Sequence, residues 1–131
     1  MRLTFREIGG HPGDRYPEWI ASITGKSGVY VIKSKRGRIL YVGESHTGRL
    51  KATLVRHFQR WKRDKLNKFT KTDWSRTTGQ VYDRGDCLVW LHPCRKDQAQ
   101  KLQYALIQQL NPRDNNVDGS GELGDLSDVP F

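Results

Sequence analysis

The chain has 131 residues, of which 23 are Lys or Arg and 14 are Asp or Glu, so its formal net charge is +9. This length suits one compact domain, and such a basic composition favours a polyanionic partner. No stretch approaches the roughly 18 apolar residues that a membrane span needs, no signal-peptide pattern opens the chain, and the two cysteines lack metal-site spacing. We therefore expect a soluble, cytoplasmic domain with reduced cysteines and no membrane partner.

The first 27 residues predict little regular structure. Five Gly and Pro residues fall between positions 9 and 17. They leave room for a short strand at Leu3–Ile8 and a short helix around Glu18–Ile23. We interpret this segment as an N-terminal extension of the domain.

A β-hairpin is predicted where two β-branched and aromatic runs, Val29–Lys33 and Arg38–Val42, flank the turn-forming residues 34–37. If the residues next to this turn pair with each other, antiparallel register places Tyr30 directly opposite Tyr41. The same face then carries Ile32 and Ile39. The opposite face carries Val29, Val31, Leu40 and Val42. Because both faces are apolar, both should be covered, as in a layered α/β arrangement.

Two helices and a third strand are predicted after the hairpin. From Gly48 to about Arg63, apolar residues recur at the helical period. They are Leu50, Leu54, Phe58 and Trp61. The apolar run Cys87–Leu91, bounded by Gly and Pro, indicates a buried strand. A second helix begins near residues 95–97 and ends at Asn111-Pro112, where proline disfavours continuation. Its apolar stripe is Ala99, Leu102, Leu106 and Leu110.

These elements predict one α/β (α+β) domain over residues 1–116, with a small three-stranded, mainly antiparallel sheet flanked by helices. Residues 62–86 are polar and basic, and we interpret them as an insertion. Residues 117–131 hold four acidic and no basic residues, so residues 1–116 carry a net charge of +13. The Gly and Asp content of this acidic tail is typical of a flexible end.

Two polar residues interrupt the apolar stripes of the predicted helices. His57 lies about 20° from Leu50 on a helical wheel, and Gln103 lies about 40° from Ala99. We expect both to approach the hairpin face that carries the two tyrosines. A hydrogen-bonded core histidine is the simpler interpretation of His57. An unpaired amide would cost about 1–3 kcal/mol, so Gln103 needs a partner or a functional role.

A second stripe on the first predicted helix is basic. It consists of Arg49, Arg56, Arg60 and Arg63. A solvated face is the ordinary interpretation of such a stripe. The segment that follows adds more cations, interleaved with Trp61, Phe69 and Trp74. Phosphate neutralisation combined with aromatic stacking is typical of nucleic-acid grooves, so the pattern favours a nucleic-acid partner.

Gly28-Val29-Tyr30 and Tyr41-Val42-Gly43 resemble the two half-motifs of the GIY-YIG endonuclease superfamily. Each tripeptide alone is weak evidence. Here they stand at hairpin spacing, and a helix with Arg and His, a strand and the run Gln103–Ile107 follow. The resemblance spans roughly residues 27–115. It implies a small three-stranded sheet flanked by helices and one divalent ion, Mg²⁺ or Mn²⁺, that assists hydrolysis of a DNA phosphodiester.

The resemblance also implies roles for individual residues. Tyr30 would deprotonate or orient the attacking water, and Tyr41 would line the same site. His57 matches a histidine that some branches carry on this helix. An arginine would contact the scissile phosphate, and we favour Arg49 over Arg56 because Arg49 directly follows the loop after the second tripeptide.

A phenol with a pKa near 10 is a poor base at neutral pH, so the role of Tyr30 needs nearby positive charge or a proton relay through His57. Lys33, Lys35 and Arg49 are the cations that could supply this charge. Asn115 matches an asparagine that steadies the site in the family, although it could simply cap a loop. The predicted substrate-binding residues are Lys33, Lys35, Arg56, Arg60, Arg63 and Asn115.

Position 103 departs from the family pattern, because the family places a metal-binding glutamate there. An amide offers one neutral oxygen and lacks the charge that anchors a hard cation, so hydrolysis should be severely weakened. Three explanations stay open: an engineered Glu-to-Gln change that traps uncut substrate, a natural loss of catalysis, and a displaced carboxylate such as Glu44. We favour the first, because Gln preserves shape while deleting charge.

The sequence therefore predicts a metal-dependent endonuclease, impaired by Gln103, that acts on duplex or branched DNA. The alternative is a non-catalytic nucleic-acid-binding module that kept the fold. A third hypothesis is a protein-interaction domain whose basic surface is partly masked by the acidic tail. Sequence specificity would come from the basic insertion, the N-terminal extension or a homodimer.

Overall fold

The computed structural model describes residues 3–11, 14–58 and 82–115. The elements of these residues, in chain order, are β1 (Arg6–Glu7), α1 (Glu18–Ala21), β2 (Gly28–Ser34), β3 (Ile39–Ser45), α2 (Leu50–Arg56), the 3₁₀ turn η1 (Arg84–Asp86), β4 (Cys87–Pro93) and α4 (Lys96–Leu110). The predicted hairpin, third strand and second helix are confirmed, with ends that differ by up to three residues. The predicted end of the first helix near Arg63, most of the basic insertion and the acidic tail lie outside the described residues.

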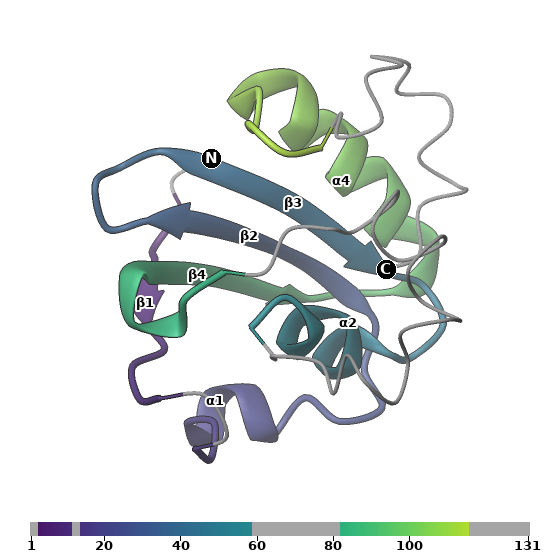
Figure 1. Ribbon diagram of the computed structural model, residues 1–131. Coiled ribbons are helices and arrows are strands. Elements are labelled where there is room, and N and C mark those ends of the chain that lie inside the picture. Colours follow the sequence, from purple (N-terminus) through teal and green to yellow (C-terminus); the bar gives the residue numbers. More distant parts are fainter. Residues whose placement is uncertain (1–2, 12–13, 59–81, 116–131) are drawn as a thin grey trace, which may run out of the picture.

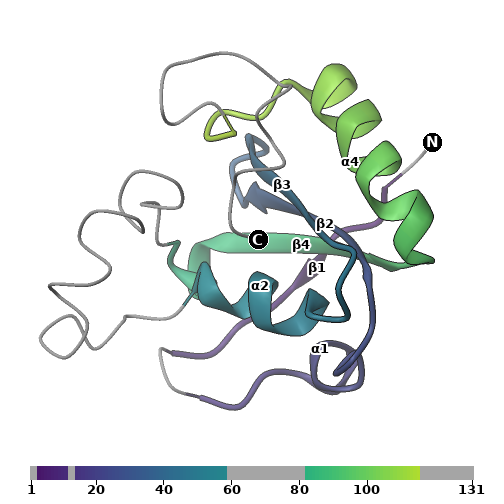
Figure 2. The ribbon, with the colours of Figure 1, turned by 90° about the vertical axis from the view of Figure 1, so that its right-hand side faces the viewer.

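The sheet forms a central layer with a helical layer on each face (Figure 1, Figure 2). Its strand order is β1-β4-β2-β3, and all pairs are antiparallel. Helices α1 and α2 cover one face, and α4 covers the other. The α+β class is confirmed, but the described residues form a sheet of four strands and not three. The additional strand is β1, because two residues of the N-terminal extension pair with the outer edge of β4.

The hairpin turn is one residue shorter than predicted. Ser34 N donates a hydrogen bond to Arg38 O at 2.8 Å, which leaves a three-residue loop. Gly37 closes this loop with a φ of 97°, which glycine adopts without strain. The pairing then shifts again at a bulge, where Leu40 is the extra residue on β3.

These two shifts change which residues face each other across the hairpin. Tyr30 pairs with Gly43 and not with Tyr41, which contradicts the predicted register. Because the total shift is two residues, Tyr30 and Tyr41 still share a face, with ring centroids 6.3 Å apart. The bulge exchanges the faces of their neighbours: Ile39 packs towards α4, and Leu40 packs on the tyrosine face.

The sheet separates two apolar clusters, so the expectation of cover on both faces is confirmed. The cluster on the α1 and α2 side includes Ile20, Tyr30, Ile32, Tyr41, Leu50, Leu54 and Phe58. The cluster on the α4 side includes Val29, Val31, Val42, Ala99, Leu106 and Ile107. The two helical stripes thus pack on opposite faces.

Tyr30 lies against the backbone of Gly43 on the neighbouring strand. The Tyr30 side chain is fully buried, and a Cβ added at Gly43 would overlap its ring and hydroxyl. Gly28 is restricted in the same way, since a Cβ there would overlap His92 O and the Pro93 backbone. The glycines of both tripeptides are therefore required by close approach between neighbouring strands.

Residues 113–115 close the outer edge of β3. Arg113 N donates to Ile39 O at 3.1 Å, and Asp114 N donates to Leu40 O at 2.9 Å. The side-chain amide of Asn115 then makes the two hydrogen bonds to Val42 that a peptide group of a neighbouring strand would make. It accepts from Val42 N at 2.9 Å and donates to Val42 O at 2.8 Å. These bonds satisfy a strand edge that would otherwise be open to pairing.

Arg84 anchors the N-terminal extension, a role that the sequence did not reveal. Its side chain is 2% exposed. The guanidinium donates to Gly9 O at 2.6 Å, Asp14 O at 2.9 Å and Arg15 O at 3.1 Å, and it lies 4.2 Å from the ring centroid of Tyr16. This anchor connects η1 to the segment between β1 and α1.

Neither cysteine takes part in a disulfide bond. Cys87 and Cys94 are free thiols that pack on opposite faces of the sheet. Burial raises the pKa of Cys87 to about 11, which keeps its thiol protonated at neutral pH. Within the described part of the chain, no helix has the length and apolar character needed to cross a membrane.

Gly43→Ala should destabilise the protein strongly, because the new methyl group must displace the Tyr30 ring in a packed core. We expect urea titrations to show a loss of about 3 kcal/mol of unfolding free energy. Gly85→Ala is the matched control, because its Cβ would contact only the Asp83 side chain, at 3.2 Å. In a Tyr30→Leu background Gly43→Ala should cost far less. Additive effects of the two substitutions would contradict this explanation.

Candidate active site

Tyr30 and His57 form a buried hydrogen-bonded pair between the sheet and α2. Tyr30 Oη lies 2.8 Å from His57 Nε2 and donates to Thr53 O at 3.5 Å. His57 is 4% exposed and follows the last residue of α2. The polar interruption in the helical stripe is thus a histidine that contacts the sheet, and the predicted proximity of Tyr30 and His57 is confirmed.

Two more tyrosines surround His57. The imidazole centroid lies 4.6 Å from the Tyr41 ring and 5.8 Å from the Tyr82 ring. Tyr82 N donates to His57 O at 2.7 Å, and Tyr82 Oη donates to Asp114 Oδ2 at 2.7 Å. We call Tyr30, Tyr41, His57 and Tyr82 the tyrosine–histidine cluster. Tyr82 was missed because it lies in the predicted basic insertion, where no periodic pattern marks it.

The cluster tyrosines are held in their protonated form. Burial raises the pKa of Tyr30 well above its ordinary value of 10.0, and the neighbouring Tyr41 adds to this increase, whereas the charge of Arg56 opposes it. Burial also raises the pKa of Tyr41 and of Tyr82, and the hydrogen bond to Asp114 raises the latter further. At neutral pH Tyr30 therefore needs His57 as a proton partner before it can act as a base.

Arg56 is the arginine whose charge acts on Tyr30. It is half-buried, and its pKa is lowered by burial first and by the charge of Arg49 second, while Tyr30 raises it. Arg49 stands at the start of α2 with an exposed side chain, and its backbone N donates to Ser45 Oγ at 2.9 Å. The electrostatics thus couple Tyr30 to Arg56 and not to Arg49. Arg60 and Arg63 lie outside the described residues.

The two lysines predicted near Tyr30 contact other groups. Lys33 Nζ lies 4.2 Å from the ring centroid of Phe5, and its pairing with Ile39 puts it on the α4 face. Lys35 forms a 2.9 Å ion pair with Glu7, which raises the pKa of Lys35. Both lysines bind the N-terminal extension to the hairpin, so Arg56 takes the electrostatic role that was predicted for them.

Gln103 and Asn115 meet at Val42, on the other side of the hairpin from His57. Gln103 is 3% exposed, and its Nε2 donates to Val42 O at 3.4 Å. Asn115 binds both backbone groups of Val42. Gln103 thus has the partner that its burial requires. The expectation that His57 and Gln103 approach the same face is wrong, because α2 and α4 pack on opposite faces of the sheet.

The described residues do not fit the divalent ion that the resemblance implies. Gln103 is neutral, and its amide is bonded to Val42 O. Within residues 3–11, 14–58 and 82–115, no three His, Cys, Asp or Glu side chains group as metal ligands. A hard cation prefers charged oxygen ligands, so Gln103 by itself is a poor anchor.

Glu44, the alternative carboxylate, faces away from Tyr30. It pairs with Val29, which puts it on the α4 face, and it is 3% exposed. His46 Nδ1 lies 3.1 and 3.2 Å from its two oxygens. Burial raises the pKa of Glu44, and the bond to His46 partly offsets this increase. Glu44 thus lies on the same side of the sheet as Gln103, and its two oxygens already contact His46.

A cavity of about 690 Å³ lies beside the cluster, between the hairpin turn and η1. Leu40 and Tyr82 line it, together with the cations Lys35, Arg36, Arg38 and Arg113 and the carboxylates Asp83 and Asp86. We call it the hairpin cavity. Lys35 and Arg113 are ion-paired with Glu7 and Asp114, which leaves Arg36 and Arg38 better placed to receive an anion.

Comparison of the sequence with models of known protein families and with curated proteins finds no match. The GIY-YIG resemblance therefore stays a prediction that rests on the quoted residues. Three features of the structure are compatible with it: the hairpin joins the two tripeptides, their tyrosines share a face, and their glycines are required by packing.

The raised pKa values of the cluster tyrosines predict a loss of stability at alkaline pH. Such a phenol stabilises the fold below its unfolded pKa of about 10, and the stabilisation is lost as pH rises towards the folded pKa. Each tyrosine should steepen the decline in unfolding free energy by up to about 1.4 kcal/mol per pH unit above about pH 10. Urea titrations of Tyr41→Phe across this range should show a shallower decline than wild type.

Tyr104→Phe is the matched control for this titration, because Tyr104 is 51% exposed on α4. It should leave the pH dependence of stability unchanged. Identical slopes for wild type, Tyr41→Phe and Tyr104→Phe would show that burial does not shift the Tyr41 pKa.

Proposed function

We propose that this chain is a GIY-YIG-type DNA endonuclease domain whose hydrolytic activity is impaired by Gln103. The observation that carries the proposal is the 2.8 Å contact between Tyr30 Oη and His57 Nε2, in a cluster that also holds Tyr41. A phenol and an imidazole in hydrogen-bond contact can exchange a proton, which is what activation of a water nucleophile requires.

The proton chemistry follows from the burial of the pair. Tyr30 is protonated at neutral pH and gives its proton to His57 Nε2 when that nitrogen is unprotonated. The phenolate, whose charge Arg56 offsets, then accepts a proton from the water whose oxygen attacks phosphorus. As the new P–O bond forms, the P–O bond to the leaving strand breaks, and the departing oxygen takes a proton from solvent. This sequence needs the cluster to open to substrate, since Tyr30 is fully buried in this structure.

The charge distribution supports DNA as the substrate. The net charge of +9 favours a polyanion. The hairpin cavity reaches Tyr82 of the cluster and presents Arg36 and Arg38 to solvent. A phosphate bound by these two arginines would lie next to the cluster, which suits a DNA backbone that approaches along the hairpin turn.

A second candidate function is a non-catalytic nucleic-acid-binding module. It is favoured by Gln103, whose neutral amide binds Val42 O on the face away from Tyr30. In this case the cluster stabilises the hairpin, and the basic surface alone contacts DNA.

Substitution at position 103 tests the proposal. Gln103→Glu should restore the charge that holds a divalent ion, and metal assistance contributes several kcal/mol to hydrolysis. We expect cleavage at least about 100-fold faster than wild type in Mg²⁺ or Mn²⁺. The measurement is product formation on gels from duplex, branched and single-stranded DNA, with EDTA as the metal-free control.

Tyr30→Phe in the Gln103→Glu background should abolish this cleavage while the protein stays folded, because Phe keeps the ring above Gly43. Tyr104→Phe in the same background should cleave normally. If Gln103→Glu cuts none of the substrates, yet wild type binds DNA in EDTA with strong salt dependence, the binding module is the correct function.

A further inference from the structure

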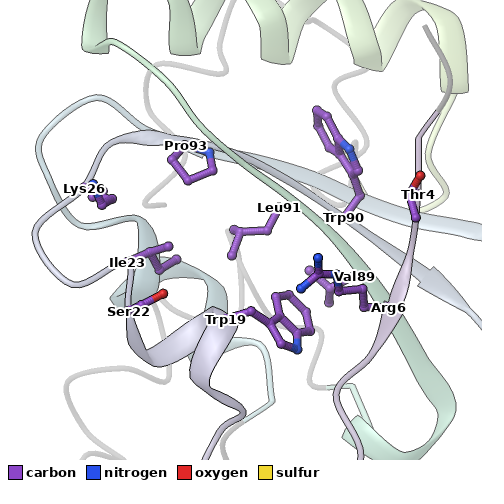
Figure 3. Close-up of a pocket in the computed structure, with 10 residues that line it drawn as sticks. All are labelled: Thr4, Arg6, Trp19, Ser22, Ile23, Lys26, Val89, Trp90, Leu91 and Pro93. Atoms are coloured by element: carbon purple, nitrogen blue, oxygen red, sulfur yellow. The ribbon is translucent and has the colours of Figure 1, made fainter.

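A groove of about 480 Å³ runs along β4 near the edge of the sheet that is remote from β3 (Figure 3). Its apolar floor is lined by Trp19 of α1, Ile23 just after α1 and Leu91 of β4. Figure 3 shows Arg6 and Lys26 towards opposite ends of the groove, and Trp90 leaves β4 on the other side of the strand. We call it the β4 groove.

The groove exists because β1 is short. β1 pairs only with Leu88 and Val89, so the outer edge of β4 from Trp90 to Pro93 has no strand partner among the described residues. The carbonyls of residues 9, 14 and 15, which bind Arg84, hold the chain between β1 and α1 in place. Arg84 therefore fixes the segment that connects β1 and α1, the two elements of the N-terminal extension that border the groove.

We propose that the β4 groove binds one unpaired nucleotide of a single-stranded DNA segment, with the base against Trp19 and the flanking phosphates against Arg6 and Lys26. The inference rests on the proposed function in one respect, that the ligand is DNA. It adds the substrate class: DNA that contains a single-stranded stretch.

The charges of the groove select an anion. Its lining contains two exposed cations, Arg6 and Lys26, and no carboxylate. The ion pairs of the described residues use other cations. Two uncompensated cations separated by an apolar floor match a backbone phosphate on each side of a base.

The aromatic floor selects a base over a bare phosphate or an acidic peptide. Trp19 is partly exposed, and the Arg6 guanidinium lies 5.4 Å from its ring centroid. Indole rings and guanidinium groups stack on nucleobases of any sequence, and this combination is what sequence-tolerant single-strand grooves use. An acidic peptide would gain the charge contacts but not the stacking.

The groove lies on the same face of the sheet as Tyr30. Leu91 of the groove floor pairs with Tyr30 on the adjacent strand and packs against the same apolar cluster. Only one strand spacing therefore separates the groove floor from the tyrosine–histidine cluster. A DNA strand that places a base in the groove approaches the cluster without crossing to the α4 face.

The test is binding of fluorescein-labelled oligothymidylate, about ten nucleotides long, a length within the range that small single-strand sites cover. Anisotropy is measured in EDTA, so that no cleavage is needed. Trp19→Leu should weaken binding at least about fivefold, and Trp19→Phe should largely preserve it. An abasic oligonucleotide of the same length should bind wild type and Trp19→Leu equally, because it has phosphates but no base to stack.

The charge contribution is tested with Arg6→Gln combined with Lys26→Gln. Loss of two phosphate contacts should reduce the slope of log affinity against log salt by about 1.4 for a single strand. Lys96→Gln combined with Lys101→Gln removes the same charge from exposed positions of α4 and should leave the slope unchanged. Thermal melting of each variant checks folding, because Arg6→Gln also removes the contact between the Arg6 guanidinium and the Trp19 ring.

Equal binding by wild type, Trp19→Leu and the Arg6 and Lys26 double variant would overturn the inference. This outcome is separate from failure of the proposed function, which is a Gln103→Glu protein that does not cut DNA. If substitution of Arg36 and Arg38 weakens binding while the groove variants do not, DNA binding occurs at the hairpin cavity and the groove inference is wrong.

Discussion

The Tyr30 side chain lies above Gly43, and its hydroxyl reaches His57 at the end of α2. These two contacts connect β2, β3 and α2 at one point, and a methyl group at Gly43 or an apolar residue at position 57 would break one of them. Leu50 and Leu54 complete the cover of this face. The candidate active site and the packing of the α2 layer therefore depend on the same three residues, so the pair stabilises the fold whether or not it also does chemistry.

The same burial sets the chemistry of the candidate site. It keeps the tyrosines protonated, so in the proposed mechanism Tyr30 passes its proton to His57 while Arg56 offsets the phenolate charge. On the other face, Gln103 and Asn115 satisfy the backbone of the edge strand at Val42. A carboxylate at position 103 would introduce a charge beside that backbone, which a divalent ion or a displaced hydrogen bond would have to compensate.

Local sequence patterns predicted the elements well, because apolar residues recur within each element at the spacing typical of a helix or a strand. The turn at Gly37, the stripe from Leu50 to Phe58 and the apolar run at β4 all lie where expected. The register failed, since one residue fewer in the loop and one bulge at Leu40 moved the partner of Tyr30 from Tyr41 to Gly43. Hydrophobic alternation does not reveal these changes. Together they shift the pairing by two residues, which leaves Tyr30 and Tyr41 on the same face.

The sequence by itself determined the basic charge, the hairpin, the two amphipathic helices and the polar interruptions at His57 and Gln103, because these depend on composition and on spacing within single elements. Only the tertiary structure decided that His57 and Gln103 lie on opposite faces, that Arg56 is coupled to Tyr30, and that Tyr82 and Arg84 are buried. The physical reason is that these contacts join segments far apart in the chain. The partners of Arg84 are backbone carbonyls of residues 9, 14 and 15, which every residue type carries and no sequence pattern can reveal.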